Sequence, residues 1–78
     1  MRILFFAQVK DATDRTEVEL NLGELDTEGL WQKLMALYPR LAPFRGNVRL
    51  ARNWEYVGPG ARFTDTDEVA LIPPVSGG

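Results

Sequence analysis

The chain has 78 residues, 45% of them hydrophobic and 26% charged, with a formal net charge of −2, a composition typical of one small globular domain rather than a disordered chain or a basic nucleic-acid binder. It has no cysteine and no histidine, so disulfides, thiolate chemistry and the commonest general base and metal ligand are excluded. The longest apolar runs are far shorter than the roughly 20 residues of a membrane span, and we expect a soluble, cytoplasmic protein.

Strand-forming residues open the chain, and residues 2–9 predict a β-strand. Polar residues at 10–14 then predict a turn. Residues 16–22 alternate apolar and polar side chains, which predicts a second strand with one buried face. The short loop between the two strands favours a hairpin.

The apolar period changes near Asp26 and Thr27, either of which can cap a helix. Pro39 ends this helix near Tyr38, because the residue before a proline avoids helical backbone angles. It is the only helix that the sequence predicts. Its apolar side chains share one stripe: Leu30, Leu34, Leu37 and Leu41.

The second half of the chain predicts three strands. Residues 47–52 alternate again, Asn53 marks a turn, and residues 54–57 form a short return strand. Residues 68–72 form the last strand. Two further turns precede it, at 58–60 and 64–67.

The order of these elements predicts an α+β fold. The first and last strands are apolar on successive residues, as central strands covered on both faces are. Placed side by side and parallel, they give the β-grasp (ubiquitin-like) fold, a mixed sheet of four to five strands with one main helix packed on one face. We expect residues 1–74 to form this domain and residues 75–78 to form a flexible C-terminal Gly-Gly tail.

The end of the chain is its most unusual feature. Residues 73–78 read Pro-Pro-Val-Ser-Gly-Gly. The two prolines stop a strand and stiffen the exit from the sheet, and the two glycines carry no side chains. Such a tail can enter a narrow channel of another protein and deliver its terminal carboxyl group there. Chain ends are commonly inert, so the pattern alone is weak evidence for a function.

With these features the chain resembles the small subunit of molybdopterin synthase, a ubiquitin-like sulfur carrier family. The resemblance lies in residues 3–9 and 64–78, and in Asn53 at a turn. It implies that the Gly78 carboxylate is adenylated with ATP, converted to a thiocarboxylate, and donates sulfur to cyclic pyranopterin monophosphate in molybdenum cofactor biosynthesis. The chain itself would bind no cofactor and no metal, and it would not be catalytic alone.

The resemblance also implies partners: a large synthase subunit, with which the chain forms a heterotetramer, an E1-like adenylating enzyme and a sulfur donor protein, but no nucleic acid or membrane. Alternation independently places Phe6, Ile72 and an aromatic from 54–56 on the outward sheet face. The tail residues implied are Val75, Ser76 and Gly77, and the partner-binding residues are Phe6, Lys10, Tyr56 and Ile72.

Other interpretations stay open. The chain could carry sulfur for thiamine biosynthesis, act as a ubiquitin-like protein modifier ligated through Gly78, or be a plain protein-binding module with an inert tail. Three acids at 65, 67 and 68 could hold a hard cation, although such a turn more often only starts a strand. The five arginines of residues 40–62 form a mildly basic side that an acidic protein could use.

Overall fold

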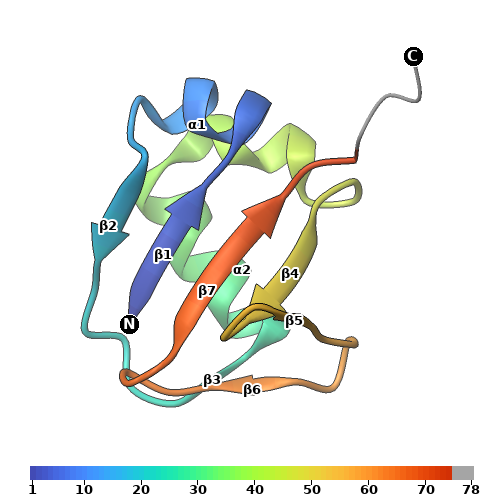
Figure 1. The fold of residues 1–78 in the computed structure, drawn as a ribbon. Helices are drawn as coiled ribbons and strands as arrows, with labels where there is room; N and C mark the ends of the chain where they lie inside the picture. The colour runs from blue at the N-terminus through green and yellow to red at the C-terminus, as the bar shows by residue number, and fades with distance from the viewer. Residues whose placement is uncertain (75–78) are drawn as a thin grey trace.

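The computed structural model describes residues 1–74, which form a five-stranded sheet covered on one face by a helix (Figure 1). In chain order the elements are β1 (Arg2–Phe5), α1 (Ala7–Thr13), β2 (Glu17–Glu19), β3 (Leu25–Asp26), α2 (Thr27–Leu37), the 3₁₀ helix η1 (Pro39–Phe44), β4 (Arg49–Arg52), β5 (Glu55–Tyr56), β6 (Arg62–Phe63) and β7 (Glu68–Ile72).

The sheet is mixed, with strand order β2-β1-β7-β4-β5. The first and last strands lie parallel in its centre, where Ile3 is opposite Val69 and Phe5 is opposite Leu71. β2 pairs antiparallel with β1, and β4 pairs antiparallel with β7. The topology predicted from the apolar first and last strands is therefore confirmed.

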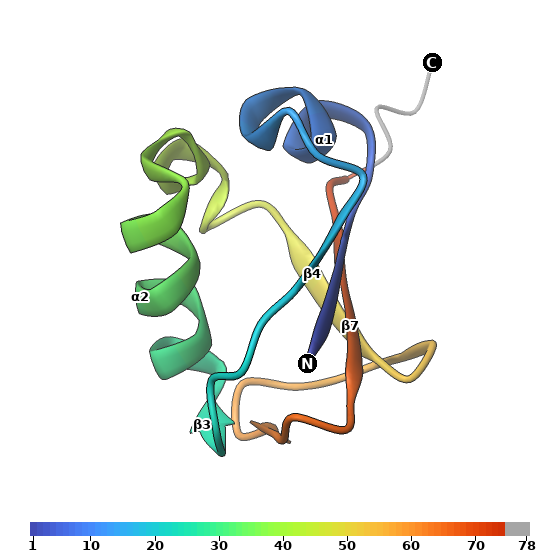
Figure 2. The same ribbon diagram turned by 90° about the vertical axis from the view of Figure 1, so that its left-hand side faces the viewer.

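Helix α2 packs on one face of the sheet (Figure 2). It begins where predicted, because the Asp26 carboxylate accepts a hydrogen bond from the Gly29 amide at 2.7 Å. The predicted apolar stripe is wrong at Leu37, which is 53% exposed. Leu41 is buried as predicted, but it lies on η1 rather than on α2. The buried side chains of α2 are Leu30, Trp31 and Leu34.

A second helix, α1, occupies the place where the sequence predicted the end of a strand and a polar turn. The first strand ends at Phe5 rather than at residue 9. Val9 and Thr13 are four residues apart, so in a helix both face the core, where both are buried. The Thr13 hydroxyl donates to the Val9 carbonyl at 3.1 Å. Burial of this face therefore outweighs the strand preference of the segment.

Other differences from the sequence prediction are smaller. The segment after α2, for which the sequence predicted no helix or strand, is the 3₁₀ helix η1. β3 and β6 form a separate two-stranded sheet that the sequence did not predict. β2 covers only Glu17–Glu19 of the predicted 16–22. Within residues 1–74, no helix is long and apolar enough to cross a membrane.

Candidate functional site

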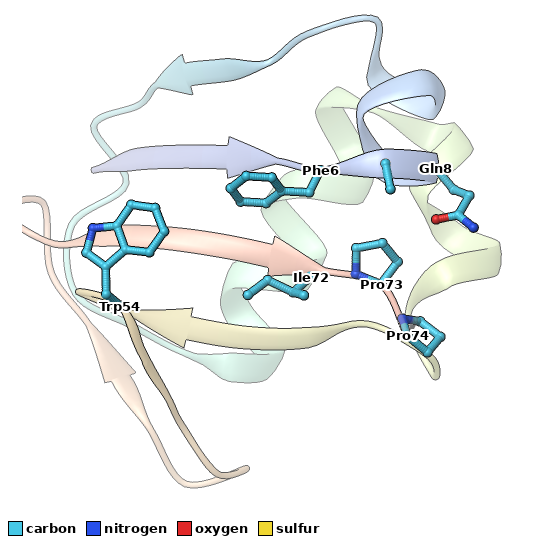
Figure 3. A pocket seen from close by; sticks show the side chains of 7 residues that line it. Phe6, Gln8, Trp54, Ile72, Pro73 and Pro74 are labelled. Atoms are coloured by element: carbon cyan, nitrogen blue, oxygen red, sulfur yellow. The ribbon is translucent and has the colours of Figure 1, made fainter. Parts of the chain in front are cut away.

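An apolar groove of about 430 Å³ lies on the face of the sheet opposite α2 and runs along β7, from the β4–β5 turn beside the start of this strand to the prolines beyond its end (Figure 3). Its walls come from three segments that are far apart in the sequence: the turn into α1, the β4–β5 turn and the end of β7. The residues that line it are Phe6, Ala7, Gln8, Trp54, Ile72, Pro73 and Pro74.

The alternation of side chains along the two central strands explains how the groove forms. Phe5 and Leu71 point toward α2 and are almost completely buried. Phe6, which is 39% exposed, and Ile72, which is partly buried, point the other way and both line the groove on the outer face (Figure 3). The predicted outward placement of Phe6 and Ile72 is thus found in the structure.

The structure does not bring Lys10 and Tyr56 into the groove. Lys10 is exposed on α1 and borders a separate depression toward Thr16. Tyr56 lies on the outer sheet face, since it pairs with Ala51, but its ring is stacked under the Arg49 guanidinium, 4.0 Å from the ring centroid. The role of both residues in partner binding stays a prediction.

Trp54 forms one wall of the groove, and its side chain is 68% exposed. The sequence predicted only that some aromatic residue from 54–56 would lie on this face. Asn53 and Trp54 both have positive φ, 52° and 70°, and connect the paired residues Arg52 and Glu55. Strand alternation no longer holds inside such a two-residue turn, so parity cannot place the indole. The available signal is Asn53, because asparagine is favoured where a hairpin turn needs a left-handed residue.

The side chain of Asn53 ties this turn to the start of β7. Its Oδ1 accepts from the Glu68 amide at 3.0 Å, and its Nδ2 donates to Asp67 Oδ1 at 3.1 Å. Asp67 also accepts from the Thr64 amide at 2.8 Å. The Thr64 backbone hydrogen bond, with smaller help from Asn53, lowers the pKa of Asp67 against the opposing effect of desolvation.

The carboxylates considered for cation binding have structural partners. Asp65 accepts from the amides of Leu22 and Gly23, at 2.8 and 3.1 Å, and lies 3.8 Å from the N-terminal ammonium group. Asp65 therefore joins the β2–β3 connection to the turn before β7, while Asp67 binds the Asn53 turn. Across residues 1–74, no three His, Cys, Asp or Glu side chains are grouped so that they could hold a metal ion.

Four of the five arginines of residues 40–62 make contacts within the chain. These contacts join the residue after η1, two residues of β4 and one of β6 to acids, a ring and a carbonyl elsewhere in the fold. They are Arg45 with Glu28, Arg62 with Glu24 at 2.6 Å, Arg49 with the Tyr56 ring, and Arg52 with the Arg62 carbonyl.

The predicted tail residues Val75, Ser76, Gly77 and Gly78 lie outside the described residues. The described chain ends at Pro74, which is exposed and belongs to the groove. Four residues span at most about 14 Å. Covalent geometry alone therefore keeps Gly78 within that distance of Pro74.

The chain was compared with known protein families and with individual proteins. The profile of the ThiS family matches residues 3–78. The "Molybdopterin synthase sulfur carrier subunit" of Escherichia coli (strain K12) is 40% identical over 82 residues, covering 100% of this chain and 99% of that protein.

Solved structures of the same fold include SAMP1 from Haloferax volcanii, with a TM-score of 0.84 and 25% identity over 100% of this chain and 98% of that one. Another is a chain of the complex of subunits 1 and 2 of the molybdopterin-converting factor from Helicobacter pylori, with a TM-score of 0.65 and 23% identity over 99% and 96% of the two chains. The predicted β-grasp fold is thereby confirmed.

Proposed function

The chain belongs to the ThiS family, and on that premise we propose that it is the sulfur carrier subunit of molybdopterin synthase. The observation that carries this proposal is the 40% identity, over essentially both full lengths, to the Escherichia coli protein of that name. The fold agrees, because the groove ends at Pro74, directly before the Val-Ser-Gly-Gly tail. The folded body would serve to hold the tail against a partner.

The chemistry of the proposed cycle takes place on the last residue. An α-carboxyl group has an ordinary pKa of about 3.5, so near neutral pH it is an anion and a poor electrophile. In the proposed cycle a carboxylate oxygen of Gly78 attacks the α-phosphorus of ATP and releases pyrophosphate, giving an acyl-adenylate. Sulfur at the oxidation level of sulfide, delivered by a donor, then attacks the acyl carbon and displaces AMP, giving a thiocarboxylate. The thiocarboxylate sulfur bonds to a carbon of cyclic pyranopterin monophosphate, and water cleaves the resulting thioester, so that the sulfur stays on the pterin and Gly78 returns as a carboxylate.

The partners of this chain supply the rest of the machinery in this proposal. The chain has no cysteine or histidine to act as a nucleophile or base. An adenylating enzyme would bind ATP, a donor protein would supply sulfur, and the large subunit would bind the pterin. The name of the Escherichia coli relative, a subunit of a synthase, supports the large-subunit partner. The proposal includes a cytoplasmic location, where the ATP that the cycle consumes is available.

The decisive experiment is intact-mass analysis after incubation with ATP, an E1-like adenylating enzyme and a sulfur source. We expect one oxygen to be replaced by sulfur at Gly78. The matched control is the chain without Gly78, which should keep its circular dichroism spectrum and its unfolding midpoint but gain no sulfur. An unchanged mass, under conditions that load a known carrier, contradicts the proposal.

A second step tests the pathway. The loaded chain should lose its sulfur to the pterin precursor when the large subunit of molybdopterin synthase is added. If it is loaded but does not transfer sulfur there, the thiamine alternative gains support. A chain that binds partners equally well with and without Gly78, and is never loaded, is the plain binding module.

A protein modifier is the second candidate function, and the similarity to SAMP1 favours it. Homologues of SAMP1 are named small archaeal modifier proteins, and the chain shares 25% identity with SAMP1 over its whole length. In that case Gly78 would be joined to lysine side chains of other proteins. Arg62 is the last basic residue, so trypsin would leave residues 63–78 attached to each modified lysine. Mass spectrometry of cellular proteins for this remnant distinguishes the two functions.

A further inference from the structure

Local structure would favour other residues at three positions of the groove. Phe6 is the N-cap of α1 but makes no side-chain capping bond, whereas Ser, Thr, Asp and Asn are preferred there. Ala7 and Trp54 have positive φ, 51° and 70°, a region that favours glycine. Departures of this kind from local preference concentrate where a protein binds or reacts.

Trp54 is the strongest of these departures. With Asn53 it forms a two-residue hairpin turn in which both residues have positive φ, and the favoured sequence for such a turn is Asn-Gly. A tryptophan replaces the glycine and leaves 68% of its side chain exposed. Little burial compensates the strained backbone, so the folding of the free chain does not account for the indole.

The surrounding structure holds the turn in this conformation. The Asn53 amide donates to the Glu68 carbonyl at 2.7 Å, and the Asn53 side chain bonds the Glu68 amide and Asp67. These three bonds fix the turn to the start of β7. The indole therefore stands over the outer sheet face, on the side of Phe6 and Ile72 (Figure 3).

We propose that Trp54 determines the affinity of the groove for the large synthase subunit, and that Asn53 is the positioning residue that keeps the indole in place before the partner arrives. This inference rests on the proposed function. Because the indole is already held in place in the free chain, binding of the partner costs less conformational entropy than it would if the side chain had to be ordered first.

The reach of the tail limits the occupant to a protein that acts on Gly78. The four residues after Pro74 span at most about 14 Å, so a protein that acts on Gly78 lies against the rim of the groove. The lining is almost wholly apolar, and the occupant is therefore an apolar segment of that protein. A synthase subunit stays associated with its partner, and lasting interfaces are the ones that cover large exposed aromatics.

The test compares the affinity of the large subunit for the wild-type chain, Trp54→Gly, Trp54→Phe and Asn53→Gly, with Leu37→Ala as the matched control. Leu37 is also an exposed apolar residue, but it lies on α2, away from the groove. We expect Trp54→Gly to weaken binding by about 10-fold or more, Trp54→Phe to restore most of it, and Asn53→Gly to fall between them. Leu37→Ala should bind as the wild type does.

The unfolding midpoint separates this role from a structural one. Glycine relieves the strain of the left-handed position, so Trp54→Gly should unfold at the wild-type denaturant concentration or above it. A clear fall in its midpoint would show that Trp54 supports the fold, and would overturn the proposal.

Fluorescence quenching adds a direct readout on the wild-type chain. Trp31 is 4% exposed and Trp54 is 68% exposed, so acrylamide quenches mainly Trp54. The large subunit should protect this emission, and Trp54→Phe should show no such protection. Unchanged quenching in the complex, or equal affinity of Trp54→Gly and the wild type, overturns the proposal.

Two further results assign the groove to another occupant and so also overturn it. In the first, Trp54→Gly loses affinity for the adenylating enzyme but not for the large subunit. In the second, Trp54→Gly changes only the self-association of the chain. Failure of the proposed function looks different, because then the wild type itself neither gains sulfur nor binds the large subunit.

Discussion

The two faces of the central sheet differ in burial, although adjacent residues place apolar side chains of the same kind on both. Phe5 is 2% exposed and Phe6 is 39% exposed; Leu71 is fully buried, and Ile72, the next residue, lines the groove. The inner face packs against α2 and forms the core, and the outer face carries the apolar groove. Residue type therefore does not distinguish core from binding surface here, whereas position along the strand does.

The largest expected effect is on the inner face. Leu71→Ala removes a fully buried side chain between Phe5 and Leu50, and should lower the free energy of unfolding by about 2–5 kcal/mol. Urea denaturation measures it. Ile72→Ala is the matched variant on the outer face and should cost clearly less. Equal losses for the two variants would remove the distinction between the faces.

On the outer face, Phe6→Ser should weaken binding of the large subunit by about 30-fold. Its stability should stay within about 1 kcal/mol of the wild type, because serine at the N-cap of α1 can accept a backbone hydrogen bond that phenylalanine cannot. Calorimetric titration and urea denaturation give the two numbers. Phe5→Ser is the control and should be strongly destabilised; a Phe6→Ser chain that binds normally contradicts the assignment of this face.

The bonds from Asp65 to the β2–β3 connection, none of whose residues line the groove, should affect stability only. Asp65→Ala leaves the amides of Leu22 and Gly23 without their acceptor and should cost about 1–2 kcal/mol. Partner affinity, measured below the unfolding range, should not change. A loss of affinity there would show that the interface extends over the whole sheet.

The smallest expected effect is a pH dependence. The Thr64 amide holds the pKa of Asp67 below its ordinary value of 3.8, so the unfolded chain binds this proton more readily than the folded chain does. The contribution of Asp67 to stability is complete above about pH 4 and is lost as the pH falls through the lower, folded value. Asp67→Asn should therefore flatten the loss of stability as the pH falls below about 4 in urea titrations. An unchanged slope would contradict the role of this carboxylate.

Much of the fold could be predicted because it depends on patterns within single segments. The apolar first and last strands predicted the parallel central pair, and alternation predicted that Phe6 and Ile72 share a face. Helix α2 was predicted from its cap and its apolar period, and Asp26 is indeed the cap. The Val-Ser-Gly-Gly sequence after Pro74, and the resemblance to a sulfur carrier family that rests partly on it, could also be recognised from the sequence.

Tertiary structure alone decided the features that depend on what a segment packs against. Residues 7–13 form a helix because Val9 and Thr13 are buried together. Strand propensities of single residues do not include the free energy of this burial. Trp54, and not Tyr56, lines the groove because a left-handed turn clamped to β7 redirects its side chain. Periodicity reports which way a regular strand or helix presents its residues. Turn conformation and burial come from contacts between distant segments, and these exist only once the chain has folded.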